Sequence, residues 1–245
     1  MRGPPRNLAP ERLDAPWHEP SVLEASLAHI AGVNRWLGGR RALRLALAAR
    51  LGRELRLLDV GTGSADLPLA LARHAAQDGG RLAVVATDRH PQMLAIAARA
   101  VAGTPAIRLT GADALALPFA PNSFDVVVLS LVLHHLADEP AEHALREAAR
   151  VAPLVIVNEL HRTSGNYLGA RFLAQTWWRD NPLTSHDGPL SVQRAYRPAE
   201  LRTLAQAAGL QVIELRRRWF YRLVLVAARA AGTAQIVPAG SVSTK

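Results

Sequence analysis

The sequence predicts an α/β fold built on a doubly wound, mostly parallel sheet of seven strands. Short apolar runs alternate with segments whose apolar residues recur at helical spacing, as in strand–helix units. A glycine turn joins the first strand to its helix, and acidic residues follow the ends of three successive strands. A doubly wound sheet binds ligands at that edge. The 245 residues are long enough for one such domain.

The N-terminal region is predicted to be irregular at first and then helical. Residues 1–20 carry five prolines. A helix is predicted from Ser21 to Trp36, because Ser21 and Glu24 form a capping-box pattern ahead of apolar residues at helical spacing. Gly38-Gly39 ends this helix, and a second helix from Arg41 to Leu51 leads into the first strand.

Seven apolar or alternating runs in the rest of the chain predict strands. The fourth run is nearly all apolar, which indicates a central place in the sheet. The predicted strands are 56–60, 81–87, 107–111, 124–129, 154–157, 210–218 and 220–227. Helices are predicted from the glycine turn to Asp78, from Pro91, from Pro140 to Arg150, and from Arg197 to Gly209.

The glycine turn after the first strand is the strongest binding signal. Gly61 and Gly63 lack a Cβ, so the backbone there can bend sharply and approach a ligand. The following helix, begun by Ser64 or Asp66, offers free N–H groups to a negatively charged group. Leu67 stands at or near the place of the third glycine of a dinucleotide fingerprint. A structural tight turn is the alternative interpretation.

Two acids farther along the chain strengthen this prediction. Asp88 ends the second strand, where a carboxylate can accept two hydroxyl hydrogen bonds from a ribose. Asp113 follows the third strand, where an acid can hold an adenine amino group. The sheet should bring both acids to the same edge as Asp59 and the glycine turn.

The ordered segments resemble the motifs of class I S-adenosylmethionine-dependent methyltransferases. The closest subgroup acts on small molecules and includes the quinone and polyketide enzymes. The matching segments are 59–64, 87–88, 111–119 and 123–128. The resemblance is strong over residues 50–160 and loose elsewhere, and Val151-Ala152-Pro153 replaces the usual Pro-Gly-Gly turn before the fifth strand.

The resemblance implies a Rossmann-like sheet ending in an antiparallel hairpin, with S-adenosyl-L-methionine as cofactor. It divides the chain into a helical lid at 1–50, a methyltransferase domain at 51–230 with an acceptor-pocket insertion at 162–196, and a tail at 231–245. Met93 is a core residue in the alternative interpretation. The predicted cofactor-binding residues are Asp59, Gly61, Thr62, Gly63, Asp66, Asp88, Arg89, Met93, Asp113, Ala114 and Ser130.

Candidate catalytic residues follow the fourth and fifth strands. His134 and His135 lie where the transferable methyl group is expected, and an imidazole can take a proton from a hydroxyl acceptor near neutral pH. The alternative is that they only pack the loop. Glu159 and His161, at the end of the fifth strand, are the second choice.

The predicted insertion carries aromatic residues that suit a flat apolar acceptor. It also contains His186 beside Asp187, which is either an acid–base dyad or, as the sequence His-Asp-Gly-Pro favours, part of a turn. The aromatic residues are Tyr167, Phe172, Trp177 and Trp178.

Composition excludes several other functions. The chain has no cysteine, so it has no disulfide and no thiolate metal site, and no metal site is predicted. The net charge of +9 comes from dispersed arginines with a single lysine, which does not favour nucleic-acid binding. No apolar stretch reaches the roughly 18 residues of a membrane span. A cytoplasmic protein is expected because the N-terminus lacks a signal-peptide pattern.

These observations predict direct transfer of a methyl group to oxygen, or to activated carbon, of a small aromatic, polyketide or quinone-like molecule. The resemblance argues against cytosine C5, ribose 2′-O and amide methylation, because the chain lacks the cysteine, the internal lysine and the Pro-Pro-aromatic motif that those enzymes use. Two alternatives are an NAD(P)-dependent oxidoreductase and a non-catalytic cofactor-binding module.

Overall fold

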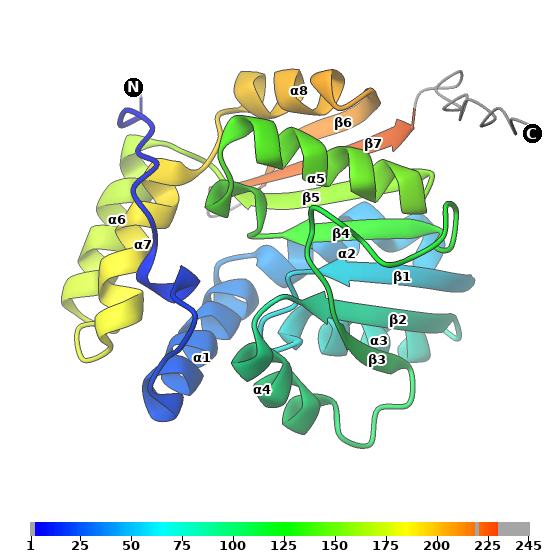
Figure 1. Cartoon of the computed structure of the whole chain (residues 1–245), viewed down its shortest axis with the longest axis horizontal. Helices are drawn as coiled ribbons and strands as arrows, with labels where there is room; N and C mark the ends of the chain where they lie inside the picture. Colours follow the sequence, from blue (N-terminus) through cyan, green and yellow to red (C-terminus); the bar gives the residue numbers. More distant parts are fainter. Residues whose placement is uncertain (1–2, 219–220, 230–245) are drawn as a thin grey trace, which may run out of the picture.

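The computed structural model describes residues 3–218 and 221–229. Its strands form one seven-stranded sheet in the order β3-β2-β1-β4-β5-β7-β6, which confirms the predicted fold class (Figure 1). The first five strands pair in parallel, and β7 runs antiparallel to β5 and β6. The strands are β1 (Glu54–Val60), β2 (Arg81–Asp88), β3 (Ile107–Gly111), β4 (Val126–Ser130), β5 (Leu154–Leu160), β6 (Leu210–Arg218) and β7 (Arg222–Arg229).

Helices cover both faces of the sheet and the carboxyl ends of its parallel strands. Helices α5 and α8 pack on one face, and α2 and α3 pack on the other (Figure 1). Helices α1, α6 and α7 lie beyond the strand ends. The helices are η1 (Arg12–Asp14), α1 (Pro20–Trp36), α2 (Gly39–Leu51), α3 (Asp66–Gln77), α4 (Pro91–Val101), η2 (Leu133–His135), α5 (Asp138–Val151), α6 (Ser164–Gln175), α7 (Pro182–Arg194) and α8 (Pro198–Ala207).

The apolar strand runs reflect burial on both faces of the sheet. Leu58 and Val60 of β1 belong to the core cluster under α5 and α8, whereas Leu57 belongs to the cluster under α2 and α3. Side chains alternate across a strand, so a parallel strand covered on both sides needs an apolar residue at nearly every position. This is why the strands could be recognised from the sequence.

Two local predictions are wrong. The capping box at Ser21 does not form, because Pro20 starts α1 one residue earlier and the Glu19 carboxylate accepts the Val22 N–H at 2.9 Å. Residues 185–188 are not a turn but part of α7, whose N-cap Asn181 accepts the N–H groups of the second and third helical residues.

The fifth strand is longer than its apolar run. Asn158 and Glu159 continue β5 because β7 pairs alongside them, Asn158 opposite Val224 and Glu159 opposite Leu223. This extension carries two polar side chains into the buried edge of the sheet. The predicted tail at 231–245 lies outside the described residues.

Truncation of Leu57 should destabilise the fold strongly. This side chain is fully buried between β1 and the helices α2 and α3, so Leu57→Ala is expected to lower the free energy of unfolding by about 2–5 kcal/mol through lost burial and a residual cavity. Urea denaturation measures the change. Leu168→Ala, at a side chain 62% exposed on α6, is the control and should change stability little. Equal effects of the two substitutions would contradict the assignment.

Candidate functional site

A cavity of about 490 Å³ lies beyond the carboxyl ends of the parallel strands. Segments far apart in the sequence close it, including α1, α6, α7 and the N-terminal segment (Figure 1). All eleven residues predicted to bind a cofactor line this cavity: Asp59, Gly61, Thr62, Gly63, Asp66, Asp88, Arg89, Met93, Asp113, Ala114 and Ser130.

The glycine turn is tightly fitted to its surroundings. Gly61 has φ +71°, and a Cβ at this position would lie 2.6 Å from Cγ2 of Val132. Gly63 has φ +55°, and its N–H donates to the Asp88 carboxylate at 2.9 Å. The turn therefore needs glycine at position 61 for both its backbone angle and its close approach to the neighbouring loop.

The acids at the strand ends differ in their surroundings. Asp88 is buried and accepts the N–H groups of Gly63 and His90, each at 2.9 Å. Asp113 is exposed and accepts the N–H of Leu115 at 2.9 Å. Burial, with the charges of Asp66 and Asp88 adding to it, raises the pKa of Asp59 to about 7. A cationic group beside Asp59 would stabilise its ionised form.

A buried arginine that the sequence analysis missed lies in the cavity wall. Arg222 begins β7 and donates from Nη2 to Oδ1 of Asn34 at 3.0 Å. Its Nε and Nη1 have no hydrogen-bond partner within the described part of the chain, and burial lowers its pKa to about 10. Asn34 also donates to Asp66, which pairs with Arg40. The free donors of Arg222 suit an anionic group.

Of the four predicted catalytic residues, two line the cavity and two do not. His134 and His135, in η2, line the cavity. Glu159 lies behind them, fully buried, and its Oε2 is 2.8 Å from Nδ1 of His134. His161 does not contact the cavity; its N–H donates to the carbonyl of Tyr221. The catalytic roles stay predictions, but Glu159 can act only through His134.

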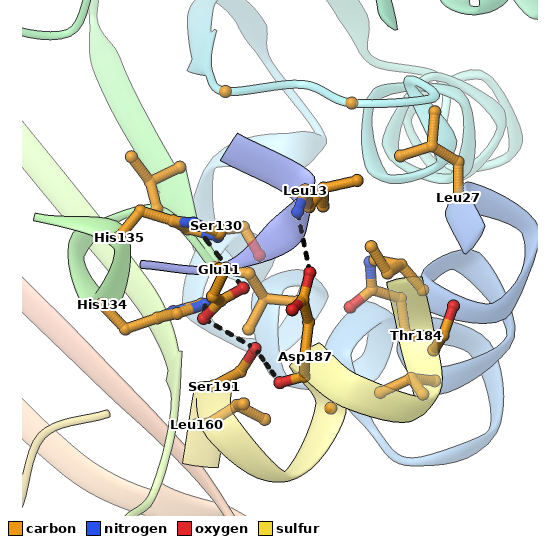
Figure 2. Close-up of a pocket in the computed structure, with 18 of the residues that line it drawn as sticks. Glu11, Leu13, Leu27, Ser130, His134, His135, Leu160, Thr184, Asp187 and Ser191 are labelled. Carbon is orange, nitrogen blue, oxygen red and sulfur yellow. Dashed lines mark hydrogen bonds and ion pairs between the residues drawn. The ribbon is translucent and has the colours of Figure 1, made fainter. Parts of the chain in front are cut away.

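The N-terminal segment adds two carboxylates that the sequence analysis did not identify. We call residues 3–18 the N-terminal strap. Glu11, 4% exposed, lies 3.8 Å from both His134 and His135 (Figure 2). Oδ1 of Asp14 lies 3.0 Å from Nδ1 of His135. Burial opposes protonation of His135, but Glu11 and Asp14 outweigh it and raise its pKa to about 9. In the absence of another cation, His135 is therefore an imidazolium at neutral pH.

Helix α7 holds the strap in place. The Asp187 carboxylate accepts the N–H group of Leu13 at 2.8 Å (Figure 2). It also accepts the N–H group of Arg12 at 3.0 Å. Arg194 donates from Nε to the carbonyl of His134 at 2.7 Å and from Nη1 to that of Ala9. His186 does contact Asp187, with Nδ1 2.7 Å from Oδ1, but Asp187 already anchors the strap.

The sheet, the glycine turn and the acids around one cavity define a cofactor-binding protein of the doubly wound α/β class. No helix within residues 3–218 and 221–229 is long and apolar enough to cross a bilayer.

Comparison with known proteins narrows this class. Residues 57–153 match the family described as a methyltransferase domain. Demethylmenaquinone methyltransferase of Thermus thermophilus is 43% identical over 118 residues, which is 48% of this chain and 49% of the relative. The ubiquinone/menaquinone biosynthesis C-methyltransferase of Rickettsia felis is 34% identical over 98 residues, 39% of each chain. The chain thus matches about half of these curated relatives or less.

Solved structures share the fold. A SAM-dependent methyltransferase from Aquifex aeolicus has a TM-score of 0.62 at 17% identity, with 87% of this chain and 100% of that chain covered. A putative O-methyltransferase from Nostoc punctiforme has a TM-score of 0.64 at 17% identity, covering 91% and 64%. Residues 57–153 therefore resemble a methyltransferase domain, as the sequence motifs predict, and the two solved structures show the shared fold.

Removal of the strap anchor should loosen residues 3–18 while the sheet stays intact. Asp187→Ala leaves the N–H groups of Arg12 and Leu13 without their acceptor, so their hydrogen exchange is expected to speed up about tenfold or more. Hydrogen exchange read by mass spectrometry measures this. Asp180→Ala, at an exposed acid before α7, is the control. Unchanged exchange in the strap would show that the anchor is dispensable.

Proposed function

We propose that this protein is an S-adenosylmethionine-dependent methyltransferase that acts on oxygen, or on activated carbon, of a small aromatic, polyketide or quinone-like molecule. The observation that carries the proposal is that one cavity is lined by Asp59, Asp88, Asp113 and the glycine turn. All of these residues lie within the segment 57–153 that matches the methyltransferase domain family. The quinone methyltransferases among the relatives support a flat, apolar acceptor.

The cavity fits each part of the cofactor. The anchored Asp88 carboxylate retains lone pairs for the two ribose hydroxyls, and Asp113 lies at the third strand end for the adenine amino group. Asp59 suits the ammonium group, because a cation would stabilise its buried carboxylate. The two free donors of Arg222 suit the carboxylate of the methionine end.

The rest of the cavity suits the acceptor. Apolar side chains from α1, β5 and α6 line it, which fits a flat ring system. These side chains are Leu27, Ile30, Val33, Leu160, Phe172 and Leu173. Residues of the strap and of α7 form the wall of this end of the cavity.

In the proposed reaction, the protein positions the acceptor next to the cofactor and places ionisable side chains beside it. The bound cofactor supplies an electrophilic methyl group. The cavity walls hold the acceptor in line with it, which is a proximity effect. His134 is the candidate base for the proton of an acceptor oxygen, and Glu159 fixes its ring orientation. His135 already carries a second proton at neutral pH, because the carboxylates of the strap outweigh the opposing effect of burial and raise its pKa, so it contributes positive charge to this end of the cavity and not a base. This arrangement supports a catalytic role for His134 better than it supports one for His161.

The alternatives make different predictions. An NAD(P)-dependent oxidoreductase should bind a nicotinamide cofactor, although Leu67 near the place of the third glycine argues against it. A non-catalytic module should bind the methyl donor but yield no methylated product. Incubation with labelled methyl donor and a cell extract, read by mass spectrometry, distinguishes these cases.

Loss of Asp88 should weaken cofactor binding. Asp88→Ala removes the acceptors proposed for the ribose, so S-adenosylhomocysteine should bind more weakly by about 1–3 kcal/mol, roughly 5- to 150-fold. Isothermal titration calorimetry measures this, with Asp180→Ala as the matched exposed control. No detectable binding to the unmodified protein would reject the proposed cofactor.

Cofactor binding should also depend on pH through Asp59. Its pKa of about 7 means that half of the carboxyl groups are protonated near neutrality in the free protein. An ammonium ligand requires the carboxylate, so binding of S-adenosylhomocysteine should be about tenfold weaker near pH 6 than near pH 8 and should release a proton at the lower pH. Calorimetry in buffers of different ionisation enthalpy counts the proton. Asp59→Asn should bind weakly with little pH dependence, and a pH slope that survives this substitution would assign it to another group.

A further inference from the structure

We propose that Glu11, His134 and His135 form a binding site for a divalent transition-metal ion at the acceptor end of the cavity, with Asp14 as a neighbouring carboxylate that contacts His135. The sequence predicted no metal site, because two of the four residues stand more than a hundred positions before the other two.

The geometry is close to that of a metal site. One ligand atom each from Glu11, His134 and His135 lies within 4.8 Å of the others. The Glu11 carboxylate faces both rings, with one oxygen 3.8 Å from Nε2 of His134 and the other 3.8 Å from Nδ1 of His135 (Figure 2). Ligands bound tetrahedrally to one zinc ion at about 2.1 Å lie about 3.4 Å apart. The three ligand atoms must therefore approach one another by about 0.4–1.4 Å to close the site around an ion.

The surroundings orient these ligands. The fully buried Glu159 accepts a hydrogen bond from Nδ1 of His134, which leaves the Nε2 lone pair directed toward Glu11. This carboxylate–histidine pairing is the usual support for a metal-bound imidazole. The hydroxyl of Ser191 lies 3.0 Å from Oε1 of Glu11 and can fix that carboxylate.

The groups around the two histidines carry a net negative charge that a divalent cation could balance. Three carboxylates, those of Glu11, Asp14 and Glu159, surround the two histidines. Arg194, 3.6 Å from Glu11, supplies one buried positive charge. Arg89 approaches Asp14 only at 3.7 Å from an exposed position. With both imidazoles neutral, the buried groups carry a charge of about −2, which either one divalent ion or two protons would balance.

The donor set selects the kind of metal. Two imidazoles with carboxylates favour zinc, iron(II) or cobalt(II), whereas magnesium and calcium prefer oxygen ligands alone. Because the four residues line the cavity, an acceptor hydroxyl can complete the coordination. The metal would lower the pKa of that hydroxyl, so that its proton is released to solvent and the oxyanion stays bound. With the metal present, His134 is a ligand and this ionisation takes the place of proton transfer to His134. This role rests on the proposed methyl transfer, but metal binding itself does not.

The test uses the full chain after dialysis against a chelator. Addition of cobalt(II) should give d–d absorption bands of nitrogen- and oxygen-ligated cobalt, and calorimetry with zinc should give one tight site. Glu11→Gln and His134→Ala should each weaken zinc binding by more than about tenfold, and Glu159→Gln by about 10- to 100-fold. His143→Ala, at an exposed histidine on α5, should change nothing.

Several outcomes would overturn the proposal. If the unmodified chain gives no cobalt spectrum and no saturable zinc binding, the cluster is held by protons and not by a metal. If His143→Ala weakens binding as much as His134→Ala, the metal lies elsewhere. Circular dichroism checks that each variant is folded, and the unmodified chain tests the proposal without any variant. S-adenosylhomocysteine binding to the metal-free chain tests the proposed function separately.

Discussion

The hydrogen bond from the Gly63 N–H to the Asp88 carboxylate is the interaction on which the site depends. It ties the turn after β1 to the end of β2, at the edge where the parallel strands finish. The Thr62 N–H adds a second link, to the carbonyl of Thr87 at 2.8 Å. A buried carboxylate without such donors would be costly, so the acid and the turn stabilise each other. The cavity opens directly above this link.

The local part of this arrangement could be predicted from the sequence. The strand, the glycine turn and the helix after it are adjacent in the sequence. Each is indicated by a pattern over a few residues: a short apolar run, two glycines, and apolar residues at helical spacing. Strands β3 and β6 accordingly have the predicted bounds. The errors at the start of α1 and at residues 185–188 also have local causes, since Glu19-Pro20 and Asn181-Pro182 are helix-start signals that the hydrophobic pattern did not reveal.

The residues that complete the site could not be predicted in this way. Glu11 belongs to a proline-rich segment with no helical or strand pattern, and it becomes buried only because α7 holds the strap over the histidines. Arg222 begins a strand whose interior residues are all apolar, and it reaches Asn34 through the pairing of β7 with β5 and the packing of α1. Such contacts depend on tertiary structure, because no signal within a short window of sequence defines them.

The cavity wall contains a buried acid and a buried base that do not pair with each other. Asp59 is a buried acid whose pKa is raised by burial and by the charges of Asp66 and Asp88, and Arg222 is a buried base with two unused donors within the described part of the chain. Asp66 and Asn34 lie between them, with Asn34 donating to Asp66 and accepting from Arg222. Burying unpaired charges reduces stability, and proteins retain such groups where a ligand compensates them. A wall that offers both an acid and a guanidinium is complementary to a zwitterion, whose ammonium and carboxylate groups would each find the opposite charge. The stability that the fold loses by burying these two groups is therefore linked to ligand choice. The same two groups favour a ligand with an amino-acid-like, zwitterionic end over a ligand with a neutral end.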